Sequence, residues 1–342
     1  MSTRLSPFTQ CVVSSLRHLY PESLADHSFD NTGLLLSSPI NPHTPRLANR
    51  VLLTIDLTRK VANEALRHDC SVVVAYHPVI FRGLKAITPE DSQQETLLRL
   101  AQRGVSVYCP HTAVDAVPGG MADWLAGVVR GEGEAEAGAE VEVINAASSG
   151  SITAANSLYK PLQNGEKPPY ASDTTGSGRL VRFEKPQELR AVIGRVMQAT
   201  NTTGGVSVAL PQGESVDTTT IQTVALCNGS GGSVIRGCST PPDLVLTGEL
   251  SHHEALAVVE RGGCVVTLFH SNSERGYLRA VMQEKLAQHV QEKWAERSEH
   301  DEKDESDQVA QILKDDSVEI IVSEVDADPY QIVRLDDQEM KN

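Results

Sequence analysis

Aromatic residues are scarce in this chain of 342 residues, where Phe, Trp and Tyr together make up 4%. So few rings exclude a broad stacking platform of the kind that binds single-stranded nucleic acid. Basic residues are also in deficit, because 30 Lys and Arg stand against 45 Asp and Glu and leave a net charge of −15. This balance excludes an extended phosphate-binding face and argues against an anionic membrane surface. We therefore expect no direct nucleic-acid partner and no membrane partner.

Long apolar runs are missing as well. No stretch approaches the roughly 18 apolar residues of a membrane span. The first ten residues have neither a basic stretch leading into an apolar core nor an Arg-rich amphipathic pattern, so no signal peptide and no clear transit peptide is predicted. We expect a cytoplasmic protein, and a nuclear or mitochondrial pool stays an open alternative.

Cysteine occurs six times, and no two cysteines form a C-x-x-C pair. Without paired spacing, a zinc site made of thiolates is not expected. Most of the six lie next to apolar runs typical of strands, which favours buried thiols over disulfides. They are Cys11, Cys70, Cys109, Cys227, Cys238 and Cys264.

Strand and helix patterns alternate over most of the chain, whose length favours about two domains. In the first 130 residues, three runs of β-branched and apolar residues are separated by helical patterns: 51–55, 71–75 and 105–109. Such runs are typical of parallel strands that are buried on both faces. The alternation resumes at residue 180, with strands expected at 180–183, 206–210, 221–226, 244–246, 264–269 and 318–322.

Composition also indicates where domains end. We expect an N-terminal α/β lobe at 1–130 and a C-terminal α/β lobe at 179–342, each with a mostly parallel sheet. A variable insertion at 131–178 is acidic and rich in Gly, Pro and Ser, and a charged loop follows at 297–307. The two acidic segments are interpreted as solubilising loops rather than docking surfaces.

Three predicted strands run directly into polar side chains. His77 follows the strand 71–75, His111 and Asp115 follow 105–109, and His270 with Glu274 follows 264–269. Ligands bind at the carboxyl ends of strands in open α/β sheets, and nitrogen with carboxylate oxygen suits zinc, iron or manganese. Each residue also has a structural interpretation, in which the histidines form ordinary hydrogen bonds, Asp115 is a turn residue and Glu274 closes a capping box with Ser271. Spacing alone leaves both interpretations open.

Two further segments follow strands in the C-terminal half. Glu249 and His253 lie near the start of a predicted helix, where they are pocket residues or plain surface residues. A glycine loop follows the strand 221–226, and its backbone N–H groups predict either an anion-binding loop or a tight turn. Its residues are Asn228, Gly229, Gly231 and Gly232.

Several segments taken together resemble the Nif-three-like family, also called the GTP cyclohydrolase I type 2-like family. The matching segments are FDNTGL (29–34), YHPVIF (76–81), HTAVD (111–115), CNGSGG (227–232), TGELSHH (247–253) and HSNSERG (270–276). The closing SEVDADP (323–329) resembles the eukaryotic branch.

The resemblance implies a two-lobed α/β fold with a dinuclear metal centre in the cleft between the lobes. It also implies a homo-oligomer, since ring-shaped hexamers are common in the family. Its metal ligands fall on four residues of this chain, and one or two divalent ions per chain (Zn, Fe or Mn) are implied. The ligands are His77, Asp115, His270 and Glu274. Three further residues, His111, Glu249 and His253, are expected to orient ligands and water or to carry protons.

Two positions depart from the family pattern. Tyr76 stands where many bacterial relatives have a second metal-binding His, and a neutral phenol is a poorer ligand than imidazole. One metal is then bound weakly, by water, or by Tyr76 or His111. Phe29 stands where relatives often have Trp, which we interpret as a packing substitution.

Three functions are compatible with these residues. The first is a metal-dependent hydrolase for a nucleotide-like or phosphate-bearing small molecule. The second is a non-catalytic interaction protein, because eukaryotic relatives are named for binding a transcriptional co-regulator. The third is a metal carrier that uses the same ligands without turnover.

Overall fold

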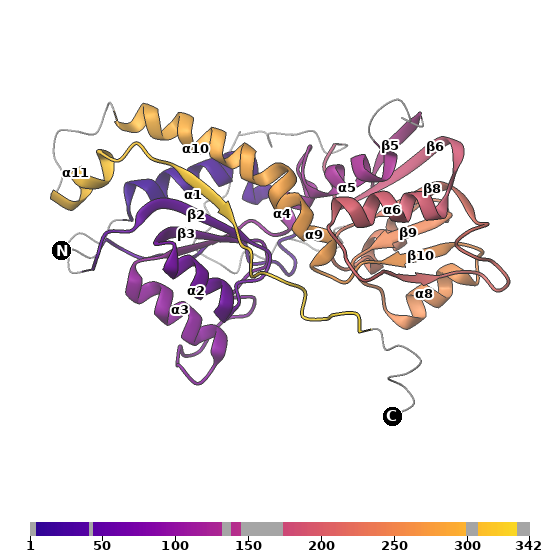
Figure 1. Ribbon diagram of the computed structural model, residues 1–342, viewed down its shortest axis with the longest axis horizontal. Helices are drawn as coiled ribbons and strands as arrows, with labels where there is room; N and C mark the ends of the chain where they lie inside the picture. Colours follow the sequence, from indigo (N-terminus) through magenta and orange to yellow (C-terminus); the bar gives the residue numbers. More distant parts are fainter. Residues whose placement is uncertain (1–4, 41–43, 132–137, 145–173, 299–306, 334–342) are drawn as a thin grey trace. The chain divides into compact units, whose positions relative to one another are not determined.

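The computed structural model describes residues 5–40, 44–131, 138–144, 174–298 and 307–333 (Figure 1). Most of the predicted insertion at 131–178 and of the charged loop at 297–307 lies outside these residues. The described residues form two compact units. The first unit contains residues 5–120 and 277–326, and the second contains residues 121–144, 176–276 and 327–333.

The first unit contains a five-stranded sheet with the order β1-β4-β3-β2-β11. The pairs β4-β3, β3-β2 and β2-β11 are parallel, and only the edge strand β1 runs antiparallel to its neighbour β4. The apolar runs of the sequence form the middle strands, as predicted, and Val51, Leu52 and Leu53 are fully buried. The strands are β1 (Gly33–Leu36), β2 (Ala48–Thr54), β3 (Cys70–Ala75), β4 (Ser106–Cys109) and β11 (Glu319–Val322).

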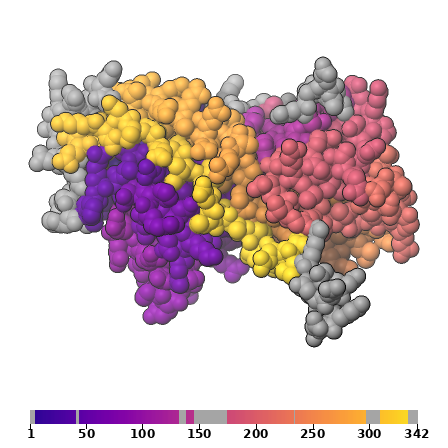
Figure 2. All heavy atoms as spheres, in the orientation of Figure 1, coloured from indigo at the N-terminus to yellow at the C-terminus, as the bar shows by residue number. Residues whose placement is uncertain are grey.

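Helices cover both faces of this sheet, with α1 (Pro7–Leu19) and α10 (Gln283–Ser298) on one face and α2 (Arg59–Arg67) and α3 (Ser92–Arg103) on the other (Figure 1). The ring of Phe8 in α1 packs edge-on against Trp294 in α10, with centroids 5.4 Å apart. Figure 2 shows α10 (orange) and the segment that carries β11 (yellow) side by side on the surface of this unit. The short helices are Glu22–Leu24, α4 (Thr112–Ala116), Leu278–Met282 and α11 (Asp307–Leu313).

The second unit contains a six-stranded sheet with the order β5-β6-β8-β9-β10-β7. Its strands β8, β9 and β10 are parallel, whereas β5, β6 and β7 pair antiparallel with their neighbours, so this sheet is mixed rather than mostly parallel. The apolar side chains of α5 and α6 pack against it. The strands are β5 (Ala139–Ile144), β6 (Gly178–Glu188), β7 (Ser207–Ala209), β8 (Thr220–Leu226), β9 (Leu244–Thr247) and β10 (Cys264–Thr267). The helices are α5 (Met121–Arg130), α6 (Leu189–Ala199), α7 (Gly232–Gly237), α8 (His252–Val259) and α9 (Asn272–Tyr277).

These units differ from the continuous ranges 1–130 and 179–342 expected from the sequence. Helix α5 belongs to the second unit because its apolar face packs on β6 and α6. Residues 277–326 belong to the first unit because α10 packs on α1 and β11 pairs with β2. Composition marks where a chain is polar, but it does not show which sheet a late strand joins.

All six cysteines keep their thiols, and five of them are buried, as predicted. Burial raises the pKa of the Cys109 thiol well above its ordinary value, so this thiol stays protonated. No helix in the described ranges is long and apolar enough to cross a membrane.

Candidate metal centre

In the first unit, His77 lies just past β3, and a carboxylate holds its ring in place. The Nδ1 atom of His77 lies 2.9 Å from Oδ1 of Asp56, which follows the neighbouring strand β2. An ionised carboxylate can only accept, so Nδ1 carries the proton and Nε2 keeps its lone pair for a ligand. The sequence analysis missed Asp56, although the residue stands one position past the predicted strand 51–55 at the same sheet edge.

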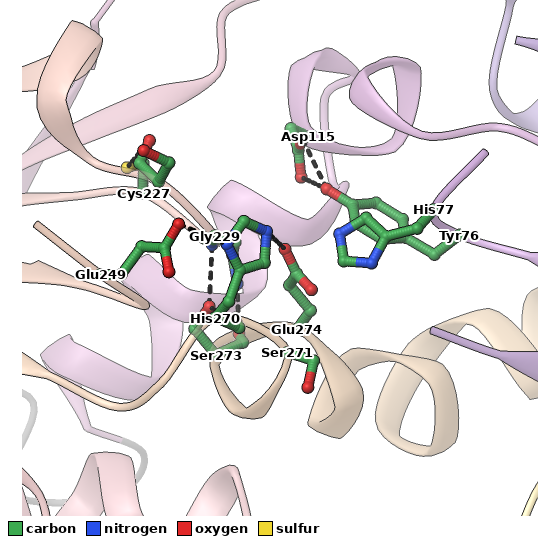
Figure 3. A network of polar contacts seen from close by, with 12 residues as sticks. Tyr76, His77, Asp115, Cys227, Gly229, Glu249, His270, Ser271, Ser273 and Glu274 are labelled. Atoms are coloured by element: carbon green, nitrogen blue, oxygen red, sulfur yellow. Dashed lines mark hydrogen bonds and ion pairs between the residues drawn. The ribbon is translucent and has the colours of Figure 1, made fainter. Parts of the chain in front are cut away.

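Asp115 lies in α4, after the adjacent strand β4, and Tyr76 holds its carboxylate. The Tyr76 hydroxyl lies 2.9 Å from Oδ1 and 2.8 Å from Oδ2 of Asp115, and both side chains are buried (Figure 3). The phenol therefore donates its proton to a predicted metal ligand. The sequence left open whether Tyr76 binds a metal itself. This geometry favours the hydrogen bond to Asp115 as the role of the Tyr76 hydroxyl.

His111 caps the start of α4 in a strained backbone conformation, with φ of +34°. Its Nδ1 atom lies 2.6 Å from Oδ1 of Asp30, whose side chain is fully buried. Burial alone would raise the pKa of Asp30, but the hydrogen bond and charge of His111, with the hydrogen bonds from Thr112 and Asn31, hold it below the ordinary value. The rings of His111 and His77 have centroids 5.6 Å apart, so the two imidazoles form one cluster.

In the second unit, His270 and Glu274 lie close together and form a pair of candidate metal ligands, called the donor pair below (Figure 3). Nε2 of His270 lies 3.5 Å from Oε1 of Glu274, and its Nδ1 lies 3.0 Å from Oε1 of Glu249. The Glu274 side chain is almost fully buried. Two ligands at about 2.1 Å from a tetrahedral ion are separated by roughly 3.4 Å, so this nitrogen and oxygen fit one metal ion. Glu249 holds the proton on Nδ1 and thereby leaves the lone pair of Nε2 toward Glu274.

The local backbone explains how His270 and Glu274 meet. Phe269, directly before His270, has φ of +68°, a conformation that a bulky residue rarely adopts. The N–H and the hydroxyl of Ser271 both donate to Asp328 Oδ2, at 3.1 and 2.9 Å, so this N–H is not given to Glu274 as the predicted capping box requires. Oε1 of Glu274 lies near Nε2 of His270.

The glycine loop lies against this donor pair. Gly229 has φ of +61°, and a Cβ there would stand 2.8 Å from Oε1 of Glu274 and 3.0 Å from Nε2 of His270. Its N–H donates to the Ser273 hydroxyl at 2.8 Å, and the N–H of Gly231 donates to the Glu249 carbonyl at 3.2 Å. Two N–H groups of the predicted anion loop are thus used inside the protein. The geometry therefore supports a different role for this loop, in which Gly229 leaves space for the side chains of His270 and Glu274.

The remaining loop and helix residues lie around these groups. The Asn228 amide donates to the Ser273 carbonyl, and a Cβ on Gly232 would collide with the Glu254 carboxylate. His253 is exposed in the first turn of α8, where its ring lies edge-on to His252. In the described ranges, His253 makes no hydrogen bond with His270 or Glu274.

Comparison with known proteins identifies relatives over nearly the whole chain. A model of the family described as Duf34/NIF3 (NGG1p interacting factor 3) matches residues 9–305. The "Protein NIF3 homolog" of Schizosaccharomyces pombe is 45% identical over 271 residues, which is 79% of this chain and 85% of that protein. The "NGG1-interacting factor 3" of Saccharomyces cerevisiae is 36% identical over 325 residues, 94% of this chain and 96% of that protein.

Solved structures share the fold. A Bacillus cereus protein related to NIF3 superposes with a TM-score of 0.65 at 20% identity, over 97% of this chain and all of that chain. Reduced HcgD from Methanocaldococcus jannaschii gives a TM-score of 0.60 at 18% identity, over 91% of this chain and 95% of that chain.

Proposed function

The chain belongs to the Duf34/NIF3 family, and from this premise we propose that it is a divalent-metal-dependent hydrolase of a nucleotide-like or phosphate-bearing small molecule. The observation that carries the proposal is the pair of Nε2 of His270 and Oε1 of Glu274, 3.5 Å apart and backed by a glycine that leaves room for both. The proposal also assigns a ligand role to His77 and Asp115 of the first unit. Nitrogen and carboxylate donors of this kind suit zinc, iron or manganese.

Each supporting residue has a defined task in this proposal. A bound divalent ion would supply Lewis-acid chemistry at a carbonyl or phosphoryl oxygen and lower the pKa of a water toward about 7. Asp56 and Glu249 each hold the Nδ1 side of a ligand imidazole, so that Nε2 is the nitrogen that would bind the ion. Tyr76 fixes the carboxylate of Asp115. Asp30 holds the ring of His111 through Nδ1, so its Nε2 is the nitrogen that would exchange a proton with the reacting group.

Elemental analysis of the purified full chain tests the ligand assignment. We expect at least one divalent ion per chain in the wild type and much less in Asp115→Ala. Asp217→Ala is the matched control, because this aspartate is exposed and pairs only with an exposed arginine in the described residues. Full metal retention by Asp115→Ala contradicts the assignment.

Turnover needs a separate experiment. We would measure hydrolysis of a panel of nucleotides and phosphoesters with added manganese or zinc, in the wild type, His270→Ala and His252→Ala. His252 is exposed and serves as the control for loss of a histidine. Activity should disappear only in His270→Ala, and hydrolysis that survives in this variant contradicts the proposed chemistry.

The name of the yeast relative supports a second candidate function. A protein that is 36% identical over 94% of this chain is called NGG1-interacting factor 3. We propose as the alternative that this chain binds a transcription-related protein through the same fold, without catalysis. The purified full chain should then bind the NGG1 counterpart, and His270→Ala should retain that binding. Absence of binding between the two purified proteins contradicts the alternative.

A further inference from the structure

Two phenylalanine rings stand half exposed beside the histidine cluster of the first unit. Phe29 is 53% exposed and Phe81 is 48% exposed, and their ring centroids lie 6.4 Å apart at an angle of 47°. Phe8 and Phe183, in contrast, are buried in the cores. Phe29 thus packs against Phe81, as the sequence suggested, but about half of the residue faces solvent.

Both rings lie on chain segments that carry a histidine of this cluster or the residue that holds one. Phe29 directly precedes Asp30, whose buried carboxylate binds Nδ1 of His111 at 2.6 Å. Phe81 stands four residues after His77. The segments are cross-linked, since the amide of Asn31 donates to the carbonyl of Ile80, next to Phe81. The aromatic pair is thus fixed relative to His77 and His111, whose rings are 5.6 Å apart.

We propose that Phe29 and Phe81 form a stacking site for a planar heteroaromatic ring, so that the substrate of the proposed hydrolase carries a nucleobase. This inference rests on the proposed function and narrows its substrate from any phosphate-bearing molecule to a base-bearing one. Aromatic faces left in water are unfavourable, and a nucleobase stacked on them removes apolar surface from solvent on both sides. Stacking of this kind tolerates different bases, because every base presents a π-face.

The position of the two rings favours a nucleobase over another copy of the chain or a protein partner. Two further exposed apolar residues, Leu84 (42%) and Ile87 (52%), follow Phe81 in the same loop. An apolar patch alone would suit another copy of the chain or a protein partner equally well. The two rings, however, belong to the same short segments that position His77 and His111, where a reacting phosphate would be held. A ligand that bridges rings and histidines needs a planar group and a polar group, as a nucleotide has.

Isothermal titration calorimetry of the purified, metal-loaded full chain tests the inference. The probes are adenosine 5′-monophosphate, guanosine 5′-monophosphate and ribose 5-phosphate, which carries no base. The double variant Phe29→Ala/Phe81→Ala removes both rings, Phe29→Tyr/Phe81→Tyr retains them, and Ile87→Ala removes a similarly exposed side chain without a ring. Because all three positions are exposed, the variants should keep the wild-type melting temperature to within a few degrees.

The wild type should bind the nucleotides at least tenfold more tightly than ribose 5-phosphate. The double alanine variant should lose this difference and keep its affinity for ribose 5-phosphate, while the tyrosine variant and Ile87→Ala should match the wild type. Equal affinities for all three probes, no binding of either nucleotide, or an unchanged preference in the double alanine variant would overturn the inference. A lower mass of this variant by light scattering, with unchanged nucleotide binding, would assign the rings to contacts between copies instead.

Failure of the inference and failure of the proposed function give different results. If the substrate lacks a base, metal content and hydrolysis of simple phosphoesters stay intact while the base preference is absent. If the protein is not a metal-dependent hydrolase, no phosphoester is turned over, whereas nucleotide binding still depends on the two rings.

Discussion

Replacement of Gly229 by alanine is the sharpest test of the donor pair in the second unit. The added Cβ would stand 2.8 Å from Oε1 of Glu274, and an ordinary contact begins at 3.4 Å. The carboxylate oxygen would therefore have to retreat by about 0.6 Å, which exceeds the roughly 0.2 Å tolerance of metal–ligand distances. Glu274 is almost fully buried and has little room to swing away. We expect the affinity for zinc or manganese to fall by about tenfold to a hundredfold.

The substitution also strains the backbone, and a second variant separates the two effects. An L-residue at φ of +61° costs about 1 kcal/mol of folding free energy, which lowers the melting temperature by a few degrees. Gly213→Ala has the same kind of strain, since Gly213 has φ of +89°, but its Cβ would meet nothing within 4 Å. Both variants should therefore lose stability through backbone strain, and only Gly229→Ala, with its contact to Glu274, should lose metal affinity.

The assay is a competition titration of the metal against a chelator, with thermal unfolding of the metal-free proteins measured in parallel. Metal affinity of Gly229→Ala equal to that of Gly213→Ala would refute the reasoning. The pair of His270 and Glu274 would then be an ordinary ion pair rather than half of a metal centre.

Three further predictions follow from single contacts. Asp56→Ala removes the partner of His77 Nδ1 and should weaken metal binding about tenfold to a hundredfold in the same titration; an unchanged affinity would show that this carboxylate does not orient His77. The pKa of Asp30 is lowered in the folded state, so its contribution to stability is present above about pH 4 and is lost as pH falls through the folded pKa. Unfolding of Asp30→Asn by urea should therefore depend less on pH below about 4 than that of the wild type, and parallel pH profiles would contradict the assigned shift. Leu52→Ala in the buried strand β2 should lower the free energy of unfolding by about 2–5 kcal/mol in denaturant titration, and a loss under about 1 kcal/mol would show that the core there is loosely packed.

The sequence predicted the inner strands well because a continuous apolar run has few alternatives once both faces of a sheet are covered. It also placed His77, Asp115, His270 and Glu274 in the segments that follow strands, where ligands bind in open α/β sheets. It did not reveal Asp56 as the partner of His77 or Tyr76 as the donor to Asp115. Those contacts depend on side-chain directions that spacing along the chain does not encode.

The directions of the antiparallel strands were harder to predict for a different reason. Strand β5 is mostly exposed or half-buried, and β7, which forms where a strand was predicted at 206–210, has only three residues. Neither pattern indicates which way its strand runs. The directions of β5 and β7 are set by pairing with β6 and β10, and pairing is a property of the folded sheet.

The return of β11 to the first sheet has a consequence for biosynthesis. Residues 319–322 supply the strand beside β2, so this sheet stays one strand short until residue 322 has left the ribosome. The second unit, by contrast, has all six of its strands once residue 267 has emerged. Although domains generally fold in the order of their synthesis, here the sheet that begins the chain receives its last strand after the other sheet has all of its strands.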